Sequence, residues 1–159
     1  MLETRGRITI DAQGEVLVIQ GAIDEASGLL ELLGRARERR LVLDLAGVTF
    51  INSLGVRDWI RMQAAAQRDG IAIELRRVAE PLIHQLNMIV ATRGSAKVTS
   101  FFAPYACDGC GREEAVLLEV AAHAGALAAQ QAPTIPCPEC GAQLEFNDFP
   151  ERYFSFLPV

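Results

Sequence analysis

Four cysteines at regular spacing are the residues whose types suggest chemistry most directly. They form two Cys-x-x-Cys-Gly segments, "CDGCG" at 107–111 and "CPECG" at 137–141. In each segment the two thiolates converge on one point, and the glycine lets the backbone turn so that N–H groups face sulfur. Four thiolates complete the tetrahedral coordination of Zn²⁺. We therefore expect one structural zinc ion per chain, in a zinc-ribbon-like unit, with the ligands Cys107, Cys110, Cys137 and Cys140.

The spacing of the two cysteine pairs is longer than usual. The 26 residues between Cys110 and Cys137 exceed the roughly 15 to 20 of the common zinc pattern. The stretch "EEAVLLEV" predicts a strand of the ribbon, and the alanine-rich "AAHAGALAAQQA" is expected to form a loop or short helix. His123 and His84 are interpreted as ordinary side chains, because four thiolates need no fifth ligand.

A reactive dithiol is the alternative interpretation of the cysteines. A thioredoxin-like site would place one pair at a helix start after a strand, whereas duplicated pairs that are each followed by glycine suit a metal better. A zinc ion with four thiolate ligands has no open position for catalysis. The cysteines therefore favour a structural role.

A second candidate for chemistry is the hydroxyl of Ser53 in "TFINSLGVRDWIRM", residues 49–62. It separates an apolar run from an amphipathic pattern, so we expect Ser53 to be the N-cap of a helix, a role worth about 0.5 to 2 kcal/mol relative to alanine. A phosphate there would add about −1.5 to −2 charges at the positive end of the helix dipole, which the fold tolerates. A partner docked on this surface would not tolerate it. Ser53 is thus either a cap or a binding switch.

The elements that would position these residues alternate along the chain. Periodicity predicts strands at 7–12, 15–21, 41–45, 71–75 and 96–103, the first two forming a hairpin. Helices are predicted after Asp24, after Ser53 and near Pro81. This order indicates an α/β fold with a mixed sheet and helices packed on it. A boundary near residues 103 to 106 would divide the chain into a domain at 1–103 and a zinc-ribbon-like domain at 104–159.

Two separated motifs resemble those of the STAS family, the anti-sigma factor antagonists. The segment "LVLDLAGVTFINSLGVRDWI" is similar to the family signature, in which an apolar strand leads to an Asp-Ser-(Ser/Thr)-Gly segment that opens a helix. The segment "VIQGAID" resembles the Gly-Glu-Leu-Asp segment after the family's second strand. The resemblance covers about residues 5 to 103, and it implies a STAS-like fold for that part.

The resemblance also implies a function and a set of site residues. In the family, a partner that is both a serine kinase and an anti-sigma factor phosphorylates the serine of the motif, and the unphosphorylated form binds this partner and releases the sigma factor. The phosphorylated position corresponds to Ser53. Asn52 stands where the family has aspartate, and Leu54 replaces a small hydroxyl residue. The implied partner-binding residues are Asp24, Asn52, Ser53, Leu54 and Gly55.

Composition restricts the possible partners. The chain has 159 residues, 50% of them hydrophobic, and a net charge of −5, which argues against a general binder of nucleic acid or anionic membranes. From residue 104 onward, 2 basic residues face 8 acidic ones, so this part would repel phosphate. The charged N-terminus and the lack of a long apolar run predict a cytoplasmic protein. We expect the aromatic tail "FNDFPERYFSFLPV" to pack on the ribbon or the first domain, or to fill a groove of a partner.

Three functions follow from these patterns. The leading hypothesis is a regulatory module that binds a serine kinase or anti-sigma factor. The second is a constitutive STAS scaffold without phosphorylation. The third is a thiol oxidoreductase, which ranks last because the sequence contains no phosphate-binding loop, paired carboxylates or Ser/His/Asp set typical of an enzyme. The patterns leave the oligomeric state open.

Overall fold

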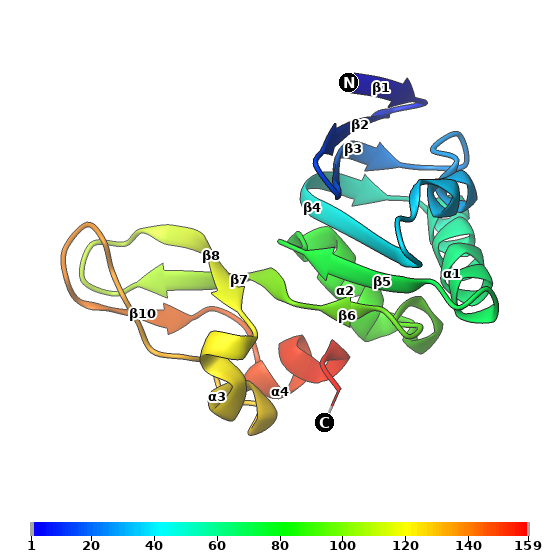
Figure 1. The fold of residues 1–159 in the computed structure, drawn as a ribbon. Coiled ribbons are helices and arrows are strands. Elements are labelled where there is room, and N and C mark those ends of the chain that lie inside the picture. Colours follow the sequence, from blue (N-terminus) through cyan, green and yellow to red (C-terminus); the bar gives the residue numbers. More distant parts are fainter. Residues whose placement is uncertain (1, 159) are drawn as a thin grey trace.

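The computed structural model describes residues 2–158 as two β-sheets with helices around them (Figure 1). The first sheet has six strands in the order β1-β2-β3-β4-β5-β6, and the second has four in the order β8-β7-β10-β9. The strands of the first sheet are β1 (Leu2–Arg5), β2 (Ile8–Gln13), β3 (Val16–Ile23), β4 (Arg40–Ile51), β5 (Ala72–Arg76) and β6 (Lys97–Val98). Those of the second are β7 (Ser100–Cys107), β8 (Glu113–Glu119), β9 (Ile135–Pro136) and β10 (Gln143–Phe146).

The helices fall between these strands and after the last one. The α-helices are α1 (Ser53–Arg68), α2 (Glu80–Met88), α3 (Ala124–Ala128) and α4 (Pro150–Tyr153). The 3-10 helices are η1 (Leu29–Arg35), η2 (Val90–Thr92), η3 (Ala121–His123) and η4 (Phe154–Phe156). The molecule is therefore a mixed α/β protein, as the sequence predicts.

The first sheet is mixed. β2 pairs antiparallel with β1 and β3, and β3, β4, β5 and β6 are parallel. β2 and β3 correspond to the predicted strands at 7–12 and 15–21, so the predicted hairpin is confirmed. Since right-handed crossovers between neighbouring parallel strands return on the same face, η1, α1 and α2 lie on one face of the sheet. Alternation places buried side chains on that face and ion pairs on the other: Ile19, Leu43 and Leu75 are buried, whereas Arg40 binds Glu74.

Two predictions about the N-terminal part were incomplete. β1 was not expected, because "LETR" is a short edge strand with mostly polar side chains. The helix expected after Asp24 is the 3-10 helix η1 rather than an α-helix. It begins only after Gly28, whose φ of 64° is left-handed and interrupts helical geometry.

The predicted strand at 96–103 is wrong as a single element. Val98 pairs with Leu75 in the first sheet, whereas Ser100 pairs with Glu119 in the second. The chain therefore changes sheets at Thr99, a few residues before the boundary that the sequence suggested, and residues 103 to 106 lie inside β7.

The aromatic tail joins the two sheets. Tyr153 donates a hydrogen bond from its hydroxyl to the Phe102 carbonyl at 2.6 Å, and its own carbonyl accepts one from the Asn87 side chain at 2.9 Å. Phe154 and Phe156 are buried and pack edge-on against Phe101. The expectation that the tail packs back on the chain is confirmed, and one continuous core extends through both sheets.

Candidate functional site

The start of α1 lies where β3 and β4 end. These strands run parallel, and Ile23 is the register partner of Ile51. The N–H of Asn52 donates to the Ile23 carbonyl at 3.1 Å, which fixes the turn that leads into the helix. As a result, the segments after both strands meet at one edge of the sheet, and Ser53 is exposed there.

The helix cap differs from the prediction. Asn52, with an extended backbone, is the N-cap, and its side-chain oxygen accepts a hydrogen bond from the Gly55 N–H at 2.7 Å. Ser53 is the first helical residue, and among residues 2–158 its hydroxyl has no hydrogen-bond partner. Asparagine caps helices about as well as serine, so the position of the cap depends on where β4 ends. The Ser53 hydroxyl is consequently not needed to start the helix.

Gly55 lets α1 approach the strand ends closely. A Cβ atom at this position would lie 2.8 Å from the Ile23 carbonyl oxygen and 3.0 Å from Cγ1 of Ile51. Backbone cannot yield as a side chain can, so any larger residue would push the helix start away from the sheet. Gly55 therefore holds the candidate surface in place by its small size.

Asp24 organises the neighbouring turn from a buried position. Only 8% of the residue is exposed, and its carboxylate accepts hydrogen bonds from the Arg7 guanidinium at 3.0 Å and the Ala26 N–H at 2.9 Å. The hydrogen bond from Arg7 holds the pKa of this carboxyl below its usual range. Asp24 thus stabilises the turn through these hydrogen bonds and is not itself part of the exposed surface.

The exposed acidic residue at this place is Glu25, which the sequence analysis did not select. Its carboxylate accepts a hydrogen bond from the Asn52 side-chain amide at 3.2 Å. The only sequence signal was its position directly after Asp24. Glu25 puts a negative charge next to the cap, at the positive end of α1.

Two large apolar side chains that are close to Ser53 in sequence are exposed. Phe50 is 54% exposed and Leu54 is 41% exposed. Exposed apolar side chains beside a polar rim are typical of protein-binding surfaces. We define the Ser53 surface as Glu25, Phe50, Asn52, Ser53 and Leu54.

The corrected cap leads to a stability prediction. Asn52→Ala removes the side-chain acceptor for the Gly55 N–H, so the free energy of unfolding should fall by about 1 kcal/mol. Ser53→Ala should change it by less than about 0.5 kcal/mol, because no hydrogen bond is lost. Urea denaturation of both variants measures the difference, and a larger loss for Ser53→Ala would contradict the assignment of the cap.

The four cysteines lie at the ends of two hairpin-like turns of the second sheet. Cys107 ends β7, and Cys137 directly follows β9. The two turns share one hydrogen-bond pattern: the Gly111 N–H donates to the Cys107 carbonyl at 2.8 Å, and the Gly141 N–H donates to the Cys137 carbonyl at 3.0 Å. Both glycines have a φ of 75°, the left-handed region that favours glycine. The repeated Cys-x-x-Cys-Gly segments therefore fold in the same way.

The pairing of β7 with β10 brings the two turns together. The Sγ atoms of Cys107 and Cys140 are 3.4 Å apart, and those of Cys110 and Cys137 are 3.8 Å apart. All four lie within 4.8 Å of one another, and all four thiols are free. Sulfur atoms about 2.3 Å from a tetrahedral zinc would be about 3.8 Å from each other, so the donor set fits a metal ion.

The surroundings of the cysteines shift the pKa values of Cys107 and Cys140 in opposite directions. The backbone N–H of Cys110 lowers the pKa of Cys107 to about 7. The Ala142 N–H also lowers the pKa of Cys140, but the Cys107 sulfur and burial outweigh it and raise the value to about 11. One thiolate therefore forms readily near neutral pH, whereas a bound cation would favour further ionisation.

The two histidines lie outside this cluster. Within residues 2–158, the group of residues placed to share a metal ion contains the four cysteines and no histidine. His84 packs edge-on against Tyr153, with the ring centroids 6.2 Å apart. His123 ends η3.

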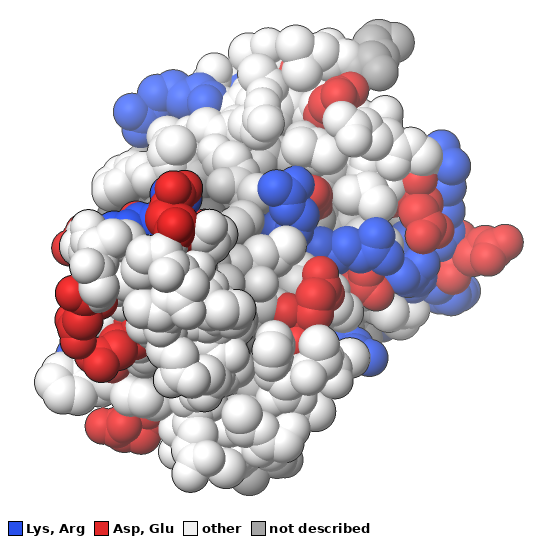
Figure 2. Space-filling view, turned by 90° about the vertical axis from the view of Figure 1, so that its left-hand side faces the viewer, with Lys and Arg blue, Asp and Glu red and all other residues white. Residues whose placement is uncertain are grey.

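Two wider observations bear on partners. Among residues 2–158, no helix combines the length and apolar character needed to cross a membrane. Figure 2 shows basic side chains, with acidic ones among them, from the centre to the right-hand edge of the face that it presents, and mostly acidic side chains along the left-hand edge.

Comparisons with family models, curated proteins and solved structures found no match for this chain.

Proposed function

We propose that the chain is a regulatory protein-binding module of the STAS type, similar to anti-sigma factor antagonists. Its binding surface is the Ser53 surface, and phosphorylation of Ser53 by a partner serine kinase or anti-sigma factor switches it. The observation that carries this proposal is the free, exposed hydroxyl of Ser53 on the first residue of α1, next to a cap that Asn52 supplies. The serine can be modified without loss of the cap.

The position of Ser53 makes phosphorylation compatible with the fold. A phosphate on the first residue of α1 would lie near the free N–H groups and the positive dipole end of that helix. It would also add about −1.5 to −2 charges to a segment whose Phe50 and Leu54 side chains are exposed. A partner that buries these apolar side chains would have to desolvate the phosphate, which disfavours binding.

Glu25 compensates for the missing aspartate of the family motif. The family has a carboxylate directly before the serine, whereas this chain has Asn52. The hydrogen bond from Asn52 to Glu25 holds a carboxylate at the same edge, from a different strand end. The Glu25 carboxylate supports recognition of the Ser53 surface by a kinase that binds an acidic group next to its target serine.

For the second sheet we propose a structural zinc site formed by the four cysteines. Zinc would tie the two turns together at the end of the sheet far from α1 (Figure 1). The convergence of all four sulfurs favours this role over a thiol oxidoreductase, which would need one separate reactive pair. The zinc-bound sheet then serves as a rigid support for the first sheet.

A constitutive scaffold without phosphorylation is the second candidate. The observation that favours it is Leu54, an exposed apolar residue directly after Ser53 that provides contact area independent of any phosphate. The two candidates differ in one respect: a scaffold binds its partner equally well with and without phosphate on Ser53.

Leu54→Ala tests whether the Ser53 surface contacts the partner. It should weaken binding to a kinase-type anti-sigma factor by about tenfold, because a central apolar contact is worth about 1 to 2 kcal/mol. Leu117→Ala in β8 is the matched control, since Leu117 is 38% exposed against 41% for Leu54. Titration calorimetry measures both affinities, and equal affinities for the two variants would place the partner elsewhere.

A further inference from the structure

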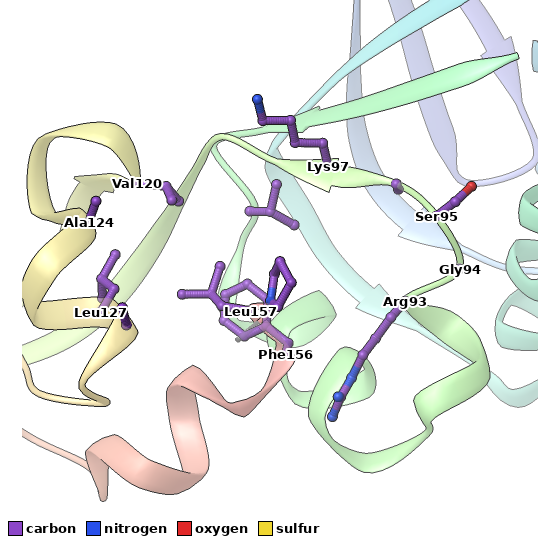
Figure 3. A pocket seen from close by; sticks show the side chains of 13 residues that line it. Arg93, Gly94, Ser95, Lys97, Val120, Ala124, Leu127, Phe156 and Leu157 are labelled. Carbon is purple, nitrogen blue, oxygen red and sulfur yellow. The ribbon is translucent and has the colours of Figure 1, made fainter.

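A cavity of about 610 Å³ lies between the two sheets. One wall is the segment 93–98, which includes β6. The others are Val120 and helix α3, which lie between β8 and β9, and the tail residues 156–158 (Figure 3). Small-molecule sites typically have volumes of about 300 to 1,000 Å³ and lie where separate parts of a fold meet. None of the lining residues belongs to the Ser53 surface or to the four cysteines, so neither site accounts for the cavity.

Most of the cavity wall is apolar. Figure 3 shows Val120 and Leu127 on one side, with Phe156 and Leu157 of the tail in the middle. A wall of this kind stabilises the apolar body of a ligand by about 25 cal/mol for each Å² that it removes from water.

The charged residues of the wall are all cationic. Among the thirteen lining residues, only Arg93 and Lys97 carry charge, and neither forms an ion pair within residues 2–158. Arg93 donates from Nε to the Leu86 carbonyl at 2.7 Å, which leaves its terminal nitrogens available. In Figure 3 the Lys97 side chain lies on one side of β6 and points away from Phe156 and Leu157, whereas the Arg93 side chain lies on the side of these tail residues. Two cations without an ion pair among residues 2–158, in a chain with a net charge of −5, indicate an anionic ligand.

The open edge of β6 adds a backbone donor to the rim. β6 pairs only with β5, and the Thr99 N–H donates to the Leu75 carbonyl at 3.0 Å. In a parallel ladder, alternate residues direct their N–H and C=O groups to the same neighbour, so those of Val98 point away from β5. Val98 lines the cavity, and within residues 2–158 its N–H has no backbone acceptor.

We propose that this cavity binds a small amphipathic carboxylate. The apolar body of the ligand packs on α3 and the tail, and its carboxylate lies at the β6 rim near Arg93 and the Val98 N–H, with the positive charge of Lys97 on the other side of β6. This inference goes beyond the proposed partner binding and does not depend on it. Because β6, helix α3 and the tail all contribute to the wall, ligand binding stabilises their mutual arrangement.

Decanoate is the probe for this proposal, with 1-decanol and decyltrimethylammonium as controls of equal chain length. Calorimetric titration of the full, zinc-loaded chain should give an affinity for decanoate at least about tenfold higher than for either control. Ala128→Trp, which fills the cavity from an exposed position, should abolish binding, whereas Ala129→Trp on the adjacent non-lining residue should not. Equal affinity for all three probes, or decanoate binding that survives Ala128→Trp, would overturn the proposal.

The cations are tested separately, so that the proposal does not depend on the folding of the tryptophan variant. The double variant Arg93→Gln and Lys97→Gln should lower the affinity for decanoate to that for 1-decanol. The matched control, Arg61→Gln and Arg68→Gln on α1, removes the same charge outside the cavity and should leave the affinity unchanged. Equal effects of the two double variants would overturn the carboxylate assignment.

Discussion

Replacing Cys137 by serine is expected to release zinc and to loosen the second sheet while the first sheet remains folded. The variant leaves three sulfur ligands, and serine does not form the thiolate that zinc prefers. Zinc content should fall from about one ion per chain to a small fraction of that. Hydrogen exchange should then accelerate in β8, β9 and β10, because the two cysteine turns lose their common anchor. In the first sheet, exchange should change little, because its helices and strands have their own apolar face.

Ala142→Ser is the matched control for this prediction. It introduces the same hydroxyl one residue beyond the Cys140 turn and changes no sulfur, so it should retain the metal. Purified wild-type protein that is free of metal, fully folded, and oxidised between Cys107 and Cys110 would contradict the zinc assignment. It would favour the redox dithiol instead.

Ser53→Asp should weaken partner binding strongly while the fold stays intact. Aspartate at the first residue of α1 suits the helix dipole, so the melting temperature should stay the same or rise slightly. Its charge should weaken binding of the unphosphorylated-state partner by at least about tenfold, through the cost of burying it against apolar groups. Ser53→Ala should bind like the wild type, because the cap belongs to Asn52.

The control for charge alone is Ser95→Asp. Ser95 is exposed and lies after η2, outside the Ser53 surface. This variant should bind the partner like the wild type. Equal binding by Ser53→Asp and Ser53→Ala, measured by titration calorimetry, would mean that the domain is not switched at this position and would favour the constitutive scaffold.

The four clustered cysteines could be predicted from the sequence because the geometry of each pair is local. Each Cys-x-x-Cys-Gly segment specifies its own turn, and Gly111 and Gly141 adopt the same left-handed φ. The pairing of β7 with β10, which brings the two turns together, could not be predicted from either segment alone. It was inferred only because a zinc ion requires four ligands.

The details at the start of α1 could not be predicted because they depend on contacts between distant segments. Asn52 and Ser53 are nearly equivalent as caps, and the hydrogen bond from Asn52 to the Ile23 carbonyl decides between them. The exposure of Glu25 and the burial of Asp24 likewise depend on Arg7, which lies 17 residues away from Asp24 in sequence. Sequence periodicity contains no signal for these contacts.

The change of sheets at Thr99 shows the same limit. The apolar run at 96–103 has the composition of one strand, and nothing local marks a break. The chain changes partner because β8 and the tail compete with β5 for pairing and packing, and Phe101 is buried among the tail aromatics. Tertiary contacts, and not local strand propensity, thus determine which sheet each part of 96–103 joins.

The central claim, a switch at Ser53, is tested most directly by intact-mass analysis. The wild-type chain and Ser53→Ala are incubated with ATP and a kinase-type anti-sigma factor that binds the wild type, and their masses are then compared. The switch predicts that the wild type gains the mass of one phosphate, that Ser53→Ala gains none, and that the modified chain no longer binds the kinase. A wild-type chain that binds this kinase and stays unmodified, or a phosphate that also appears on Ser53→Ala, would contradict it.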